Sequence, residues 1–131
     1  MTTPLRIGIA GLGTVGLGTL EVLSAHAEMF ASRGPRPLTV TSVAARDWAR
    51  DRGVDLDGYE CFDSAVDMAC SDNVDVVVEL IGGSDGIAKD LIEAALAHGK
   101  HAVTANKALI AIHGTALAMA AEESGVSLAY E

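Results

Sequence analysis

An alternation of short β-rich runs with longer helical stretches is the feature that most constrains this chain, and it continues along all 131 residues. The clearest strand prediction is Asp75–Ile81 (DVVVELI), a nearly continuous apolar run of the kind found in strands that are buried on both faces. Parallel strands are joined by crossover connections, usually helices, and these crossovers are right-handed. The alternation therefore predicts an α/β fold in which helices cover a doubly wound, mostly parallel sheet.

Apolar spacing and helix-breaking residues set the expected boundaries of the elements. Strands are predicted over residues 5–10, 38–45, 59–62, 75–81 and 101–105, and a further strand begins within 126–131. Helices are predicted over about 14–32, 47–52, 64–70, 86–98 and 106–124, the last with an interruption near His113–Gly114. Gly99 and Gly125 follow the last two helices, in the position where glycine favours a helix end.

Composition limits the classes of protein to which the chain can belong. Half of the residues are hydrophobic but only 4% are aromatic, so a single domain with an aliphatic core is expected. The net charge of −9 argues against nucleic acid or an anionic membrane as a partner. The sequence has neither an apolar run of 18 residues nor a signal-peptide pattern, and we expect a cytoplasmic protein.

The two cysteines, Cys61 and Cys70, form no CxxC arrangement and have no paired histidines beside them. A zinc site with four ligands is therefore not expected. We expect two buried or half-buried free thiols in a reducing compartment.

A glycine-rich turn follows the first predicted strand and opens the first predicted helix. Its sequence, GLGTVG, fits the pattern G-x-G-x-x-G in the βαβ context that gives this pattern its meaning as a dinucleotide-binding turn of a Rossmann-type fold. Gly11 permits a tight turn, Gly13 lets a pyrophosphate approach the backbone, and Gly16 allows close packing of the helix on the sheet. The N–H groups at the helix start then hold the phosphates. The predicted cofactor-binding residues of this turn are Gly11, Leu12, Gly13, Thr14, Val15 and Gly16. A turn without a ligand is the alternative.

The end of the second strand indicates which dinucleotide is bound. An acidic residue at this place normally accepts hydrogen bonds from the adenosine ribose. Here Arg46 comes first and Asp47 follows it. A guanidinium suits a 2′-phosphate, which favours NADP. The alternatives are a solvated arginine at the strand end, or NAD bound through Asp47.

Two further segments follow predicted strands and should therefore lie on the ligand side of the sheet. Gly82 and Gly83 can let a nicotinamide riboside lie against the backbone. Lys107 opens an apolar helix, where a cation is disfavoured because unpaired N–H groups already carry partial positive charge. An amine at this place can donate to a carbonyl oxygen of a substrate, which makes Lys107 a candidate catalytic residue. The alternative is a surface lysine at a frayed helix start.

These motifs together carry a family resemblance. They are GLGTVG (11–16), DVVVELIGG (75–83), GKHAVTANKALIA (99–111), HG (113–114) and YE (130–131). In this combination the chain resembles the N-terminal NAD(P)-binding domain of homoserine dehydrogenase, over nearly its whole length, with VTANKALIA as the most specific part.

The resemblance implies an oxidoreductase that interconverts L-homoserine and L-aspartate 4-semialdehyde with NADP or NAD, in the biosynthesis of threonine, isoleucine and methionine. It implies that Lys107 lies between nicotinamide and substrate, and that Glu131 contributes to a monovalent-cation (sodium) site. Residues 1–131 would be the dinucleotide-binding domain, with the substrate and dimerisation domain absent from this chain. The fragment alone would then be inactive, and the full-length enzyme would be a homo-oligomer.

Two other interpretations remain open at this point. A sugar or polyol dehydrogenase of the glucose–fructose oxidoreductase type shares the fold and a GKHV-like run, but has Glu-Lys-Pro where this chain has Ala105–Lys107. Asn106 and Ala108 argue against that type. A non-catalytic nucleotide-binding module is the third possibility, supported by a chain that stops on a predicted strand and so looks like part of something longer.

Overall fold

The computed structural model describes residues 3–48, 51–82 and 86–130. Within these ranges six strands form one sheet in which every neighbouring pair is parallel. The strands are β1 (Leu5–Ala10), β2 (Leu38–Ala44), β3 (Glu60–Phe62), β4 (Val76–Glu79), β5 (His101–Thr104) and β6 (Leu128–Tyr130). The helices are α1 (Thr14–Ala25), α2 (Ala27–Arg33), α3 (Ala65–Ala69), α4 (Ile87–Ala97) and α5 (Lys107–Ser124).

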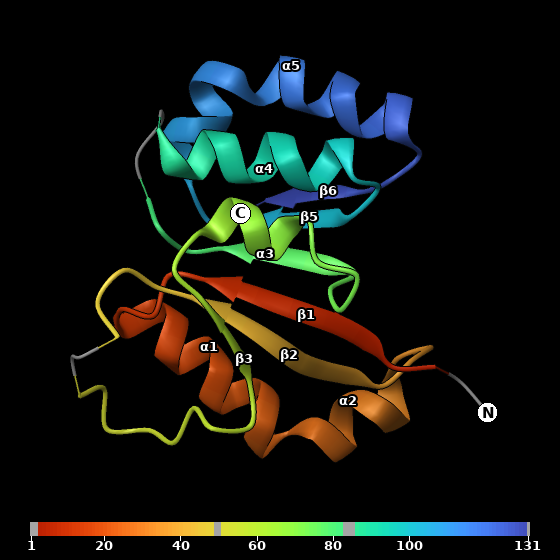
Figure 1. Ribbon diagram of the computed structural model, residues 1–131. Coiled ribbons are helices and arrows are strands. Elements are labelled where there is room, and N and C mark those ends of the chain that lie inside the picture. The colour runs from red at the N-terminus through yellow and green to blue at the C-terminus, as the bar shows by residue number, and fades with distance from the viewer. Residues whose placement is uncertain (1–2, 49–50, 83–85, 131) are drawn as a thin grey trace.

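The strand order is β3-β2-β1-β4-β5-β6, which is the doubly wound order of the Rossmann fold. The chain begins in the middle of the sheet and builds outward to β3 (Figure 1). It then returns to the centre at β4 and builds outward in the other direction. The direction of winding reverses between β1 and β4, and the connections that leave these two strands create a crevice at their carboxyl ends. The predicted fold class is confirmed.

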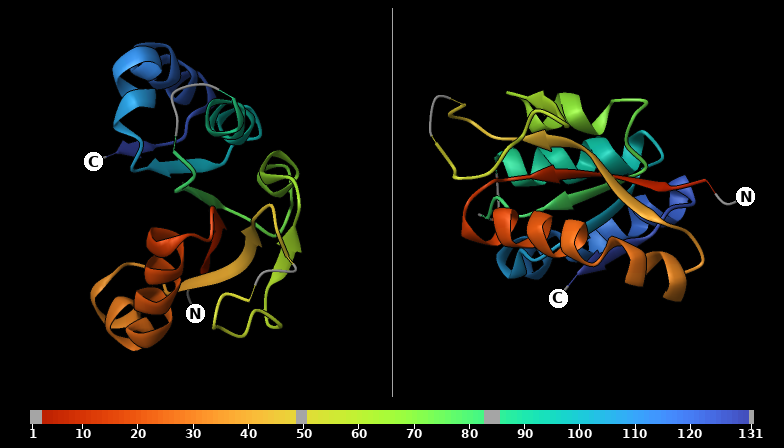
Figure 2. Two further views of the ribbon diagram at one scale, coloured as in Figure 1. Left: turned by 90° about the vertical axis from the view of Figure 1, so that its left-hand side faces the viewer. Right: turned by 90° about the horizontal axis from the view of Figure 1, so that it is seen from below.

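Helices cover both faces of the sheet, and the strand register shows why. Val77 pairs with Ala102, and both lie on the face covered by α3, α4 and α5. The neighbouring positions Ile7 and Val76 face α1 instead. Figure 2 shows α1 and α2 on the opposite side of the sheet from α3 and α4. The fully buried side chains are mostly Val, Leu, Ile and Ala, as the low aromatic content predicts.

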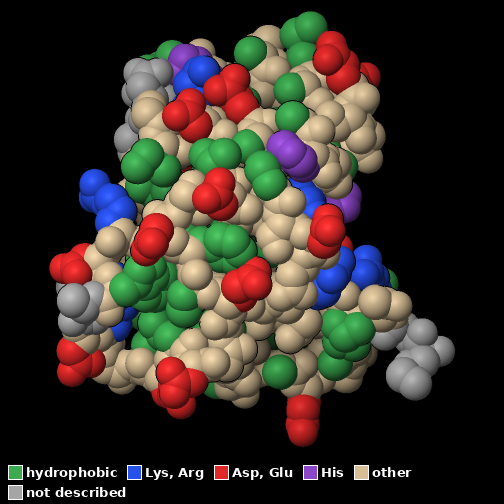
Figure 3. Space-filling model, viewed as in Figure 1, with side chains coloured by type: hydrophobic (Ala, Val, Ile, Leu, Met, Phe, Trp, Pro, Cys, Tyr) green, Lys and Arg blue, Asp and Glu red, His purple; other side chains and the backbone are tan. Residues whose placement is uncertain are grey.

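The outer surface reflects the acidic composition. Figure 3 shows Asp and Glu side chains spread over the face that carries α3 and α4. Among the residues that the structure describes, no helix is both long enough and apolar enough to cross a membrane.

The predicted helix over residues 14–32 is two helices. His26 separates α1 from α2 with φ −114° and ψ 24°, outside the helical region. Gly16 and Leu20 are buried as expected, whereas Ala27 is exposed after the break. A one-dimensional period cannot detect one non-helical residue, because the apolar spacing resumes beyond it.

The predicted helix over residues 47–52 is not present in the described part of that segment, and residues 49 and 50 lie outside the described residues. The Gly53 N–H donates to Asp51 Oδ1 at 2.8 Å, and Gly53 has φ +74°. A local turn of this kind competes with helix formation.

The predicted interruption of the last helix is wrong, because α5 continues through Gly114. Its inner residues Leu109, Leu117 and Ala121 are buried in the cluster that α5 forms with α4, and this packing outweighs the helix-weakening effect of a glycine. The end of α5 is as predicted, with Gly125 in the left-handed conformation. Cys61 and Cys70 are both free, as expected, but both are exposed, so the predicted burial of the two thiols is wrong.

Candidate functional site

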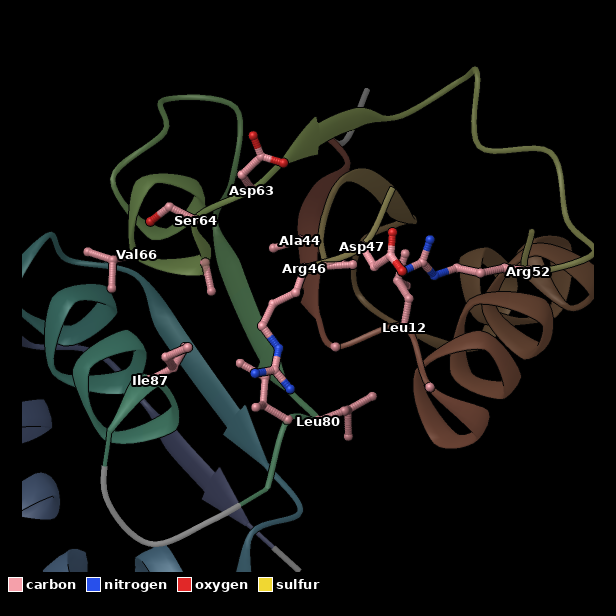
Figure 4. Close-up of a pocket in the computed structure, with 15 residues that line it drawn as sticks. Leu12, Ala44, Arg46, Asp47, Arg52, Asp63, Ser64, Val66, Leu80 and Ile87 are labelled. Carbon is pink, nitrogen blue, oxygen red and sulfur yellow. The ribbon is translucent and has the colours of Figure 1, made fainter. Parts of the chain in front are cut away.

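A pocket of about 550 Å³ opens at the carboxyl edge of the sheet, beside the β1–β4 switch point. The loops that follow β1, β2, β3 and β4 all contribute to its lining (Figure 4). The lining residues are Gly11, Leu12, Gly13, Ala44, Ala45, Arg46, Asp47, Arg52, Asp63, Ser64, Ala65, Val66, Leu80, Ile81 and Ile87. Sequence analysis predicted Gly11, Leu12, Gly13 and Arg46. It missed residues 63–66, although they too follow a predicted strand on the ligand side.

The three glycines of the turn have different structural roles. Gly11 has φ +98°, and a Cβ on it would lie 2.8 Å from the Leu80 carbonyl oxygen. A Cβ on Gly16 would lie only 1.8 Å from the Gly11 carbonyl oxygen. A Cβ on Gly13 would meet no protein atom within 4 Å. The fold therefore requires Gly11 and Gly16 to be glycines, whereas the lack of a side chain at Gly13 only keeps space open outside the protein.

The start of α1 presents unpaired backbone donors. The first intrahelical bond runs from the Leu17 N–H to the Gly13 carbonyl at 2.9 Å, so the N–H groups before Leu17 have no intrahelical acceptor. Among the described residues no side chain caps this helix, whereas Ser64 caps α3 and Asn106 caps α5. Thr14 and Val15 are exposed. A helix start without a side-chain cap, next to the free space over Gly13, is a favourable place for an anion.

Two arginines line the pocket. Arg46 lies two residues beyond the end of β2, and its exposed side chain extends toward Leu80 in Figure 4. Arg52 enters from the loop between β2 and β3, with its guanidinium carbon 5.2 Å from the centre of the Trp48 ring. This distance fits a cation–π contact. Sequence analysis did not single out Arg52, which it placed at the end of the helix predicted over 47–52.

Lys107 is the first residue of α5, as the sequence predicts, and its side chain is exposed. The residue before it, Asn106, is the N-cap, and its Oδ1 accepts a hydrogen bond from the Leu109 N–H at 3.0 Å. Lys107 is not among the residues that line the 550 Å³ pocket.

The other predicted residues lie outside this pocket or outside the described ranges. Gly82 follows β4, is exposed, and has φ +93°. Gly83, predicted to contact the cofactor, and Glu131, predicted to ligate a cation, lie outside the described residues. Within the described ranges, His, Cys, Asp and Glu form no group of three that could hold a metal ion.

A fully buried carboxylate lies beneath this edge of the sheet. Glu79, the last residue of β4, has none of its surface exposed. It accepts hydrogen bonds from the turn that contains Gly82 and from Thr104 of β5. Sequence analysis treated Glu79 only as part of an apolar strand, although a lone acidic residue inside such a run was a usable signal.

The opposite edge of the sheet is held by an ion pair. Arg6 Nη2 lies 2.9 Å from Asp75 Oδ1, and Arg6 Nε lies 3.0 Å from Asp75 Oδ2. The Arg6 backbone N–H also donates to Asp75 Oδ2 at 2.9 Å. Hydrogen bonding from the Arg6 side chain lowers the pKa of Asp75 to about 2. This pair joins the beginnings of β1 and β4, so it stabilises the sheet away from the pocket.

Comparison with known protein families agrees with this geometry. The family model described as "Homoserine dehydrogenase, NAD binding domain" matches residues 11–131. The chain belongs to this family. The predicted resemblance to homoserine dehydrogenase is thereby confirmed, and the family is favoured over the sugar-dehydrogenase alternative.

Curated homoserine dehydrogenases align with almost the whole chain. It is 45% identical to the homoserine dehydrogenase of Pseudomonas aeruginosa over 128 residues, which is 98% of this chain and 29% of that protein. It is 35% identical to the homoserine dehydrogenase of Bacillus subtilis over 127 residues, which is 97% of this chain and 29% of that protein. The chain therefore spans about 29% of the length of these curated relatives.

Solved homoserine dehydrogenase structures share the fold. The structure from Thiobacillus denitrificans superimposes with a TM-score of 0.90 at 38% identity, covering 99% of this chain and 30% of that one. A structure from S. aureus gives a TM-score of 0.90 at 30% identity, covering 100% of this chain and 33% of that one.

Proposed function

We propose that this chain binds a nicotinamide dinucleotide across the β1–β4 switch point and forms the cofactor-binding part of a homoserine dehydrogenase. The observation that carries the proposal is the open space over Gly13, next to the uncapped start of α1. A glycine that the fold itself does not need is expected where a ligand must approach the backbone closely.

The residues present fit such a cofactor. The pyrophosphate would lie on the turn of residues 11–13, where the N–H groups at Thr14 and Val15 begin the helix. The adenosine half would occupy the 550 Å³ pocket, between Leu12 and the loop of residues 63–66. Gly11 and Gly16 support this arrangement by holding the turn against Leu80 and against α1.

Arg46 supports NADP as the preferred cofactor. It lines the pocket and lies just beyond the end of β2, where the ribose of the adenosine is recognised in this fold. A guanidinium there can bind a 2′-phosphate through two hydrogen bonds. Arg52, on the same pocket, is the second cation that the phosphate could meet, and Asp47 would serve NAD.

The nicotinamide half would lie toward Gly82, Gly83 and Lys107. When bound, the nicotinamide ring supplies hydride acceptance or donation. In the full-length enzyme, the Lys107 amine would take the proton from the homoserine hydroxyl. The carbon that carries this hydroxyl would lose hydride at the same time and become the aldehyde carbon of aspartate 4-semialdehyde. The reverse reaction returns the proton to the same oxygen.

The rest of the full-length protein would supply the substrate and dimerisation domain, and Glu131 would contribute to a monovalent-cation site there. We propose that the full-length enzyme is a homo-oligomer acting on a small-molecule substrate. The net charge of −9 supports the further proposal that it has no nucleic acid or anionic membrane partner.

Isothermal titration of the 131-residue chain with NADP and with NAD tests the proposal. We expect wild type to bind and Gly13→Ala to lose about ten- to a hundred-fold in affinity, because each lost charge-assisted hydrogen bond to phosphate is worth roughly 1.5–3 kcal/mol. Gly18→Ala is the matched control, since a Cβ there also meets no atom within 4 Å but lies within α1. Equal binding by the two variants would contradict the proposed pyrophosphate site.

A further inference from the structure

The turn after β4 is held from inside the protein by one oxygen atom. Glu79 Oε2 accepts the Ile81 N–H at 2.7 Å and the Gly82 N–H at 3.0 Å. Gly82 has φ +93°, in the left-handed region, and both residues of the turn are exposed. The buried Glu79 carboxylate therefore holds two exposed residues of the turn in place through these hydrogen bonds.

The other carboxylate oxygen connects the turn to the beginning of α5. Thr104 Oγ1 donates to Glu79 Oε1 at 2.5 Å and also accepts the Asn106 N–H at 3.0 Å. Asn106 Oδ1 then caps α5 at Leu109. A continuous chain of hydrogen bonds thus runs from Gly82, through Glu79 and Thr104, to the residue that precedes Lys107.

Burying a carboxylate is costly, because the charged group is removed from water. An apolar side chain of similar size would avoid that cost but would leave the Ile81 N–H, the Gly82 N–H and the Thr104 hydroxyl without this acceptor. The three hydrogen-bond partners of Glu79 all donate, which is what an acceptor-only carboxylate requires. What the carboxylate provides beyond packing is one rigid link between two segments that lie 25 residues apart in the sequence.

We propose that Glu79 is a positioning residue that sets the turn at Ile81–Gly82 and the start of α5 in one geometry, so that the nicotinamide half of the cofactor and Lys107 are held relative to each other. This inference rests on the proposed function for its ligand. Neither Glu79 nor Thr104 is among the residues that line the 550 Å³ pocket, whereas Ile81, which Glu79 holds, does line it. The proposal therefore gives Glu79 and Thr104 no direct contact with the adenosine half and expects their larger effect on the nicotinamide half.

Amide hydrogen exchange in the cofactor-free 131-residue chain tests the link itself. Glu79→Gln keeps the size of the side chain, and Thr104→Val removes the hydroxyl. For each variant, exchange is measured at amides that make no hydrogen bond to the substituted residue. We expect Thr104→Val to speed exchange at Ile81 and Gly82, and Glu79→Gln to speed it at Asn106 and Leu109, by about ten-fold, the change that corresponds to about 1.4 kcal/mol.

Thr104→Ser, which keeps the hydroxyl, should restore the wild-type exchange rates. Amides of the distant strand β2 report global stability in the same samples. Unchanged rates across the link, or an equal rise at β2, would overturn the proposal.

Ligand titration tests the functional half of the proposal. NADP is compared with 2′-phospho-ADP-ribose, which lacks nicotinamide. We expect Glu79→Gln and Thr104→Val to weaken NADP about ten-fold and the fragment less than about two-fold, whereas Gly13→Ala should weaken both. An equal loss for both ligands, or no loss, would refute a role in nicotinamide placement. If wild type bound neither ligand, the proposed function would fail, and hydrogen exchange would still decide whether the link exists.

Discussion

The contrast between Gly16 and Gly13 gives the sharpest test of how this turn works. In the structure, a Cβ at Gly16 would lie 1.8 Å from the Gly11 carbonyl oxygen and 2.8 Å from its carbon. An ordinary C···O contact is about 3.3 Å, so α1 and the turn would have to separate by over about 1 Å. Both partners are backbone, which cannot move aside as the end of a flexible side chain can.

The expected cost follows from this displacement. Overpacking a well-packed site typically costs about 1–3 kcal/mol, and we expect Gly16→Ala at or above the upper end of that range. Such a loss is a large fraction of the ~5–15 kcal/mol by which domains are stable. Gly13→Ala should stay within about 0.5 kcal/mol of wild type, because φ −78° and ψ −161° suit alanine and its Cβ meets open space.

Urea and thermal denaturation of both variants, followed by circular dichroism, measure these differences. For a chain of this size we expect Gly16→Ala to lower Tm by about 5–15 °C. Gly13→Ala should lose cofactor affinity with little change in Tm. If Gly16→Ala were as stable as wild type, or if Gly13→Ala were equally destabilised, the separation of a fold-determining glycine from a ligand-determining glycine would be wrong.

Three further predictions concern charged groups. Arg46→Ala should lower NADP affinity about ten- to a hundred-fold, because one charge-assisted contact is worth roughly 1.5–3 kcal/mol, and should leave NAD affinity nearly unchanged in the same titrations. An unchanged ratio of NADP to NAD affinity would assign recognition of the 2′-phosphate to Arg52 instead. Lys107→Ala in the full-length enzyme should lower kcat by about 10²–10⁴-fold with Tm unchanged, and arginine should not rescue it, since a guanidinium stays protonated; a change in Tm alone would make Lys107 structural. Because the pKa of Asp75 is depressed to about 2 in the folded chain, its pairing with Arg6 stabilises the protein above about pH 4, and this stability is lost as the pH falls toward 2. After allowing for solvent screening, we expect the free energy of unfolding to fall by about 1–2 kcal/mol over this pH range. Denaturation of wild type and Asp75→Asn at a series of pH values measures this loss, which should be absent in the variant.

Local patterns in the sequence were sufficient to predict most of the scaffold. The strand at residues 5–10, the glycine turn and the helix-ending glycines Gly99 and Gly125 are features that neighbouring residues determine together. Alternation of strands and helices was enough for the fold class, because a parallel sheet is the usual way to bury such a series. The prediction that Lys107 begins a helix followed from the same local reading.

Contacts between distant segments decided the rest. The continuity of α5 through Gly114 depends on the residues that pack against this helix, which apolar spacing does not report. The exposure of Cys61 and Cys70 is likewise a tertiary property.

The candidate site divides in the same way between sequence and tertiary structure. Gly11, Gly13 and Arg46 could be found from the sequence because the phosphate-binding turn is contiguous and the strand end has a fixed place in the fold. Glu79 could not be given its role, because its partner Thr104 is 25 residues away and the pairing of β4 with β5 brings them together. The sequence alone was enough to place Gly11, Gly13 and Arg46 at the carboxyl edge of the sheet. Only the tertiary structure decided which groups at this edge touch, because hydrogen bonds need a separation of about 3 Å and strand register, set by the packing of the whole sheet, provides it.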